Sequence, residues 1–229
     1  TGRGPFFVKE LMDDLDLDFA VTYNGQYIFT KDRVLFTSPI SKLHLRHLIS
    51  YAKKEGKEIA LGTKDAMLGS KIMSFGLGSF SQRISRFVPS VLTRTVSHSF
   101  NRMVSKVVPQ KEEDLLHLMN QPIYQVLMLM TPEESEKAAA DFEDLKLTRS
   151  NPFAADVINQ GNSKLEGIRR VGKECGFDLN QVMAFGDNLN DLHMMQVVGH
   201  PVAPENARPE ILELAETVIG HHKDQSVIA

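Results

Sequence analysis

The chain has 229 residues, of which 42% are hydrophobic, and its formal net charge is −3 at pH 7. This length and composition allow a substantial core, and the small negative charge excludes a global basic field that would attract nucleic acid or a membrane surface. No apolar run approaches the roughly 20 residues that a membrane-spanning helix needs. The single cysteine, Cys175, excludes an internal disulfide framework, and this is typical of a reducing cytoplasm.

The N-terminal part of the chain, about 1–40, predicts short strands joined by tight turns. Apolar segments suggest strands at 19–23, 26–29 and 34–36. The Asn24-Gly25 pair between the first two segments is a strong turn signal. We therefore expect a hairpin-like unit at the start of the chain.

The middle part, about 41–152, contains its own apolar helices and strands, and we interpret it as an inserted α+β domain. A helical stripe of apolar residues runs from Leu43 to Ala52. Thr131 is suited to cap a second helix that begins at Pro132. Strands are expected at 58–61, 123–130 and 145–148.

The last part, 153–229, predicts strands that alternate with helices. The clearest helix runs from Ser163 to Gly176, because Ser163 and Glu166 have capping-box spacing and Gly176 can close the helix in the left-handed conformation. Cys175 falls on the apolar side of this helix, so we expect it to pack rather than react. The other expected elements are strands at 153–158, 182–185 and 218–219 and a helix from Pro209. Such alternation predicts a parallel sheet, and because the middle part is interpreted as an insertion, 1–40 and 153–229 are expected to belong to one core.

The most informative segment is Gly186-Asp187-Asn188-Leu189-Asn190-Asp191, which we call the acidic motif. It follows a short apolar run, which predicts a buried parallel strand. Two carboxylates and two amides are then expected at the carboxyl end of a strand, where open α/β sheets bind ligands. Mg²⁺ needs such oxygen ligands and commonly acts on phosphoryl groups. The alternative is a polar loop without chemistry.

Five motifs in one order carry a resemblance that covers essentially the whole chain. They are Thr1-Gly2-Arg3, Asn24-Gly25, Lys164, the acidic motif and Val202-Ala203-Pro204-Glu205-Asn206-Ala207. This pattern resembles the Cof-type branch of the haloacid dehalogenase superfamily, whose members are mostly Mg²⁺-dependent phosphatases. The resemblance implies a doubly wound parallel-sheet core with a large α+β cap inserted at 41–152, and a site between core and cap.

The resemblance also implies which residues hold the metal. Asp187 matches the carboxylate that coordinates Mg²⁺ directly. Asp191 matches the second acid of the motif, which supports the metal or its waters. Both positions follow from the match to the family's motif, residue by residue.

The remaining motif residues match the groups that bind the phosphoryl group. Thr1 and the Gly2 amide match donors to the transferring phosphoryl group, and Asn190 matches a phosphate ligand. Lys164 matches the lysine that offsets charge between phosphate and nucleophile, and Asn24 is expected to shape the site near the substrate. The alternatives are a solvated surface lysine at Lys164 and an ordinary chain end at Thr1.

The nucleophile of the family is absent from the chain. Members carry Asp-x-Asp-Gly-Thr on their first strand, and no such motif occurs here. Residues 13–18 are superficially similar, but no Gly-Thr follows them, and we interpret them as a charged helix end or loop. The chain begins at Thr1 without an initiator methionine or a signal peptide, so we expect a longer protein with its nucleophile upstream. The alternative is a degenerate, non-catalytic relative.

The function that the resemblance implies is hydrolysis of a small phosphomonoester through an aspartyl-phosphate intermediate. Sugar phosphates and phosphorylated cofactors are the implied substrates. The alternatives are a phosphosugar mutase and a non-catalytic regulatory protein that binds Mg²⁺ and phosphate. The expected partner is a small phosphorylated metabolite in the cytoplasm, with no nucleic acid and no membrane, and the oligomeric state is left open.

A basic segment lies inside the predicted cap. Between Ala66 and Lys111 the chain has no acidic residue, whereas it has Lys71, Arg83, Arg86, Arg94, Arg102, Lys106 and Lys111. We expect a local positive surface, which either attracts an anionic substrate or is an ordinary solvated face.

Overall fold

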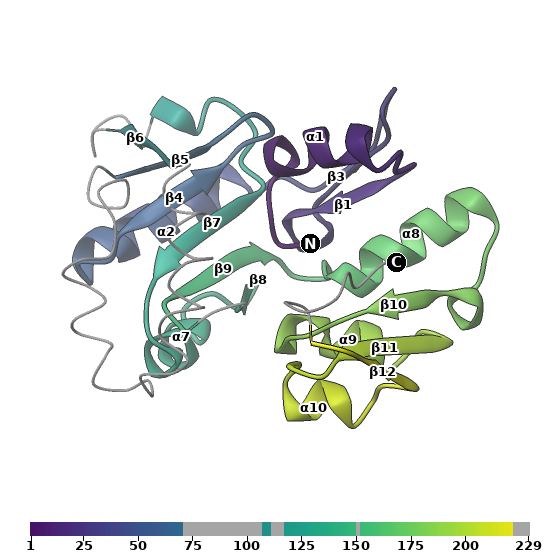
Figure 1. Ribbon diagram of the computed structural model, residues 1–229. Coiled ribbons are helices and arrows are strands. Elements are labelled where there is room, and N and C mark those ends of the chain that lie inside the picture. Colours follow the sequence, from purple (N-terminus) through teal and green to yellow (C-terminus); the bar gives the residue numbers. More distant parts are fainter. Residues whose placement is uncertain (71–106, 111–116, 150–151, 222–229) are drawn as a thin grey trace.

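The computed structural model describes residues 1–70, 107–110, 117–149 and 152–221 (Figure 1). Their strands form a six-stranded sheet and two three-stranded sheets. In Figure 1 the six-stranded sheet forms one lobe, and the C-terminal strands with their helices form a second one. The basic segment expected to give a positive surface lies mostly outside the described residues. No helix in the described ranges is long and apolar enough to cross a membrane.

The N-terminal unit is an antiparallel meander with one helix. Its elements are α1 (Pro5–Asp14), β1 (Ala20–Thr22), the 3₁₀ turn η1 (Tyr23–Gly25), β2 (Tyr27–Phe29) and β3 (Val34–Thr37). The strand order β1-β2-β3 confirms the predicted hairpin and the Asn24-Gly25 turn. Helix α1 was not predicted, and its last residues, Asp13 and Asp14, are the charged helix end expected there.

The six-stranded sheet has the order β6-β5-β4-β7-β9-β8. The elements of this lobe are α2 (Lys42–Lys54), β4 (Ile59–Gly62), β5 (Met67–Ser70), β6 (Val107–Gln110), β7 (Gln125–Leu129), α7 (Pro132–Ala139), β8 (Leu145–Thr148) and β9 (Ala154–Asn159). Helix α2 buries Leu45, Leu48 and Ala52, as the helical stripe predicted. Helix α7 begins with the expected cap, in which Thr131 and Glu134 form a complete capping box.

The C-terminal unit contains the parallel sheet. Its elements are α8 (Lys164–Cys175), η2 (Leu179–Gln181), β10 (Met183–Phe185), η3 (Leu189–Asp191), α9 (Leu192–Met195), β11 (His200–Pro204), α10 (Pro209–Leu212) and β12 (Thr217–Ile219). Strands β10, β11 and β12 pair in parallel, as the alternation predicted. Ser163 caps α8 by accepting from the Glu166 amide, and Gly176 ends the helix with φ of 77°.

Three expectations were wrong in detail. The strand expected at 153–158 exists as β9, but it pairs antiparallel with β7 and β8 and not with the parallel sheet. We therefore propose a boundary after β9 rather than at 152. Strand β10 is not buried, because it is an edge strand of its sheet, and Met183 is 60% exposed. Cys175 is exposed because it is the last residue of α8, where the helix leaves its packing surface.

Both faces of the six-stranded sheet are covered. Ile59, Val126 and Met128 face the helices α2 and α7. Ala60 and Leu127 alternate with them and face the opposite side, where they pack with aromatic residues of the N-terminal meander. The meander also contacts α8 (Figure 1). The N-terminal unit thus connects the two lobes and fixes the place where their polar residues meet.

Candidate functional site

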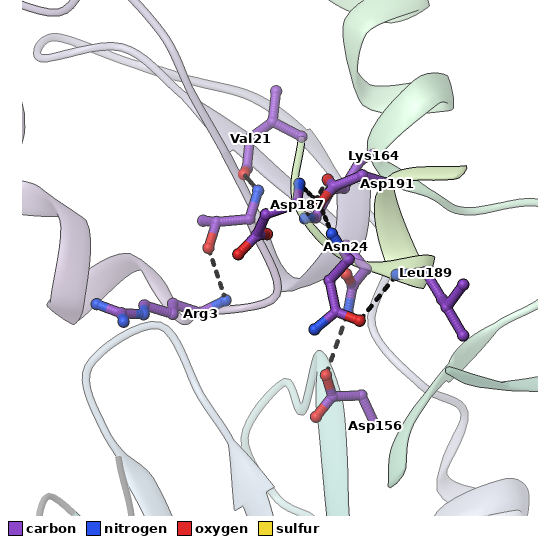
Figure 2. A network of polar contacts seen from close by, with 10 residues as sticks. Arg3, Val21, Asn24, Asp156, Lys164, Asp187, Leu189 and Asp191 are labelled. Carbon is purple, nitrogen blue, oxygen red and sulfur yellow. Dashed lines mark hydrogen bonds and ion pairs between the residues drawn. The ribbon is translucent and has the colours of Figure 1, made fainter. Parts of the chain in front are cut away.

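A polar network lies where the N-terminal unit, the six-stranded sheet and the C-terminal unit meet. Figure 2 shows Lys164 in contact with Asp191, with Asp187 beside them, and Asn24 between this pair and Asp156. These residues come from α8, the loop after β10, η1 and β9. The structure therefore brings together side chains that are far apart in the sequence.

The Lys164–Asp191 ion pair is the shortest contact of this network. The Lys164 Nζ donates to the Asp191 Oδ1 at 2.6 Å, and the two side chains are 16% and 5% exposed. The other oxygen, Asp191 Oδ2, accepts the backbone amides of Asp187 and Asn188, each at 3.4 Å. Asp191 thus joins the start of α8 to the loop that carries Asp187. A charge-assisted bond with so little exposure to water is stronger than one on the surface.

Asp187 is the carboxylate of the acidic motif that stays available. Its side chain is exposed, and no described residue forms an ion pair with it. A divalent cation such as Mg²⁺ is commonly held by one or two carboxylates plus waters and phosphate oxygens, so Asp187 fits a metal ligand. Asp191 has both oxygens engaged by Lys164 and the loop amides. Within the described ranges, no three acidic, histidine or cysteine side chains form a metal cluster.

The Thr1–Arg3 segment is fixed against the meander. The Thr1 nitrogen donates to the Val21 carbonyl at 2.9 Å, and the Asn24 amide donates to the Thr1 carbonyl at 2.9 Å. The Arg3 amide donates to the Thr1 Oγ1 at 3.2 Å. A Cβ atom added at Gly2 would lie only 3.2 Å from the side-chain nitrogen of Asn24, Nδ2. These contacts form a tight turn that leads to the network of Figure 2.

Asn24 lies at the centre of the network with a left-handed backbone, φ 53° and ψ 37°. Its side chain is buried, and the Asn24 Nδ2 donates to the Gln125 Oε1 at 3.2 Å and to the Asp156 Oδ2 at 3.5 Å. Asparagine tolerates this backbone region better than most residues. The turn after β1 therefore directs the Asn24 amide toward the six-stranded sheet.

Two residues of the network, Gln125 and Asp156, were not predicted from the sequence. The Gln125 Nε2 donates to the Asp156 Oδ1 at 3.0 Å and to the Gly2 carbonyl at 3.3 Å. Burial raises the pKa of Asp156 to about 7, although the Asn24 hydrogen bond and the charges of Arg149 and Lys164 oppose this rise. The signal that could have identified Asp156 is a lone acid inside an apolar strand, since such an acid needs partners when buried.

A cavity of about 70 Å³ opens beside Lys164. It is lined by Asn24, Lys146, Thr148, Ile158, Asn162, Ser163, Lys164, Leu165, Leu189, Asn190, His193 and Met194. Three of the predicted residues therefore line one cavity: Asn24, Lys164 and Asn190. Asp191 does not line it but forms the ion pair with Lys164. Asp187 does not line the cavity. The structure thus separates the exposed Asp187 carboxylate from the enclosed amides.

Replacing Gly25 by alanine is expected to destabilise the protein by about 3 kcal/mol or more. Gly25 has φ of 94°, and a Cβ atom there would lie 2.3 Å from the Ser163 carbonyl oxygen, which is backbone and cannot rotate away. Gly161→Ala is the matched control, because Gly161 has φ of 74° with no atom within 4 Å of a new Cβ. Urea unfolding of both variants measures the difference. Equal losses would contradict the close contact between η1 and the start of α8.

Comparisons with known proteins cover the whole chain. A profile of haloacid dehalogenase-like hydrolases matches residues 1–229. YkrA of Bacillus subtilis (strain 168) is 30% identical over 218 residues, which are 95% of this chain and 76% of that protein. The 5-amino-6-(5-phospho-D-ribitylamino)uracil phosphatase YwtE of the same organism is 23% identical, with 100% and 82% covered. The solved structure of the HAD subclass IIB sugar phosphatase BT4131 has a TM-score of 0.76 at 22% identity, with 99% and 80% covered.

Proposed function

The chain belongs to the haloacid dehalogenase-like hydrolase family. From this membership we propose that it is part of a phosphatase that hydrolyses a small phosphomonoester with the help of Mg²⁺. The single observation that carries the proposal is the 2.6 Å Lys164–Asp191 pair, which anchors the loop bearing Asp187. A lysine and an uncommitted carboxylate at the end of a parallel strand suit a phosphate dianion and its counterion.

Each residue of the site has a proposed role. Lys164 supplies positive charge near the phosphoryl oxygens, while Asp191 orients Lys164 and holds the loop. Asp187 would hold the Mg²⁺, which would neutralise part of the charge on the phosphate when bound. Thr1 and Gly2 would donate to the phosphoryl oxygens.

Two asparagines complete the proposed phosphate site. Asn190 lines the cavity next to Lys164 and would donate its amide to a phosphate oxygen. Asn24 lines the same cavity, but its amide nitrogen is engaged by Gln125 and Asp156. We therefore propose that Asn24 shapes the site and that Asn190 touches the phosphate.

The proposed reaction passes through an aspartyl-phosphate whose aspartate lies outside residues 1–229. No Asp-x-Asp-Gly-Thr motif occurs in these residues. Among the described strands, β10 is an edge strand that pairs with β11 on one side. The backbone N–H and C=O groups on the outer side of an edge strand are suited to pair with a further strand. We propose that this strand carries the attacking carboxylate to the same end of the sheet as Asp187.

The proposed substrates are sugar phosphates or phosphorylated cofactors. BT4131 is named a sugar phosphatase, and YwtE is named for a phosphorylated ribitylaminouracil. Both names describe small polar phosphomonoesters. The cavity of about 70 Å³ beside Lys164 is compatible with a small polar group next to the phosphate.

Phosphate release by the full-length protein tests the proposal. We expect turnover of small phosphomonoesters that requires added Mg²⁺ and stops with a chelator. Asp187→Asn is expected to lower kcat/KM by about 10²-fold or more, because the metal loses its carboxylate. Asp141→Asn changes an exposed acid of the other lobe and serves as the control. Mg²⁺ and phosphate binding without any turnover would instead favour the non-catalytic alternative.

A further inference from the structure

A second lysine, Lys146, lines the cavity that Lys164 lines. Lys146 lies on β8, and its register partner on β9 is Ile158, which lines the same cavity. Leu145 and Leu147 flank Lys146 and pack into the core on the other face of the sheet. Because side chains alternate along a strand, Lys146 and Thr148 face away from that core. The strand therefore presents two polar side chains to the cavity.

Within the part of the chain that the structure describes, Lys146 differs from the other partly buried lysines, because no ion pair or hydrogen bond of its side chain is found. Lys57 and Lys164 each form an ion pair, with Glu134 at 2.5 Å and with Asp191 at 2.6 Å. The Lys146 side chain is also partly buried, but no described carboxylate or acceptor contacts it. An ammonium group without a partner at a cavity wall is free to form charge-assisted hydrogen bonds with an anion that enters the cavity.

The opposite wall of the cavity carries the groups of the C-terminal unit. Asn190 belongs to the acidic motif and lies in η3, and His193 lies on α9. Apolar side chains of Leu165 and Met194 lie in the same lining. The cavity thus has polar groups on both lobes with an apolar portion in its wall. Its volume of about 70 Å³ gives room for a small polar group.

We propose that Lys146 binds a second acidic group of the substrate, so that the preferred substrate is a small phosphomonoester that carries a carboxylate or another phosphate. This inference rests on the proposed function, because it places the hydrolysed phosphate at Lys164 and Asp187. The second acidic group lies toward β8, and Thr148 supplies a hydroxyl beside it. The six-stranded lobe thereby selects the substrate by charge as well as by size.

The experiment compares matched substrates with the full-length protein. One pair is 3-phosphoglycerate and glycerol 3-phosphate, which differ by a carboxylate, and the other is fructose 1,6-bisphosphate and fructose 6-phosphate. We expect the acidic member of at least one pair to have the higher kcat/KM. Lys146→Met should remove about 10- to 100-fold of this preference, mainly through KM, since a hydrogen bond to a charged group has about that effect.

Two further variants and a binding measurement complete the test. Lys146→Arg should keep the preference because it keeps the charge, and Lys137→Met, which changes an exposed lysine on α7, should leave it unchanged. Equal kcat/KM within both pairs, or an unchanged preference in Lys146→Met, would overturn the inference.

Thermal shifts with the same four compounds distinguish a failure of the subsite from a failure of the proposed phosphatase function. If no compound is turned over but the acidic members still stabilise the protein only when Lys146 is present, the phosphatase proposal fails and the subsite stands. If the acidic compounds show neither a higher kcat/KM nor a thermal shift that depends on Lys146, the subsite is refuted.

Discussion

Replacing Lys164 by methionine is expected to lower kcat/KM for any phosphomonoester substrate by about 10²- to 10³-fold, which is typical of losing one group that stabilises developing negative charge. The same change leaves the buried Asp191 carboxylate without its cation. Removing one partner of a buried pair costs about 3–5 kcal/mol, and Asp191 is only 5% exposed. Steady-state kinetics and urea unfolding of the full-length protein measure the two effects separately.

Lys57→Met is a matched control for this prediction. The Lys57–Glu134 pair has a similar distance, 2.5 Å, and Lys57 is 18% exposed, but Glu134 is 40% exposed. Water can therefore solvate Glu134 after the change, and we expect a stability loss of at most about 1 kcal/mol with normal activity. If Lys57→Met impaired turnover as much as Lys164→Met, the effect would reflect general damage to the fold. If Lys164→Met retained full activity, the proposed role of Lys164 would be wrong.

Replacing Asp156 by asparagine is expected to flatten the pH dependence of stability between about pH 4 and pH 7. Burial raises the pKa of Asp156 to about 7 from an ordinary value of 3.8. Between these values the unfolded chain loses its proton and the folded protein keeps it, so the free energy of unfolding falls as the pH rises. The stability that protonation provides is complete below pH 4 and is lost above pH 7. Its size is on the order of 4 kcal/mol.

Asparagine resembles the neutral form of Asp156, and this sets the direction of the change. Neither group carries a charge. The asparagine side chain has one acceptor oxygen, which can still accept from the Gln125 amide that now contacts Asp156 at 3.0 Å, whereas its NH₂ group cannot accept from the Asn24 amide, now at 3.5 Å. This lost hydrogen bond does not depend on pH. We therefore compare the free energy of unfolding of Asp156→Asn with that of the wild type at each pH. This difference is expected to favour the variant more at pH 8 than at pH 4. Urea unfolding over this pH range measures it, with Asp141→Asn, an exposed acid, as the control. A parallel pH dependence in wild type and Asp156→Asn would contradict the raised pKa.

The family and most elements could be predicted from the sequence because their signals are local. The five ordered motifs predicted the haloacid dehalogenase family, and the comparisons confirm it. The caps at Thr131 and Ser163 were readable because a side chain and an amide three residues later suffice to form them. The roles of Asp187 and Asn190 at the site stay predictions. They follow from the resemblance and not from a measured contact.

Strand pairing could not be read from the sequence. An apolar strand such as β9 has the same pattern whether it pairs parallel in the core or antiparallel in a second sheet. The exposure of β10 likewise depends on which strand lies beside it. Both errors therefore concern neighbours in space rather than the existence of an element.

The sequence by itself determined the chemistry that is available at the site: two acids, two amides and a lysine at the start of a helix. Only the tertiary structure decided their partners, because a hydrogen bond between Asn24 and Asp156 spans 132 positions of the chain. The same holds for the cavity wall, where β8 places Lys146 opposite the C-terminal unit. Local patterns record what a residue can do, whereas burial and charge partners depend on packing between distant segments. This is the physical reason why Gln125, Lys146 and Asp156 were missed.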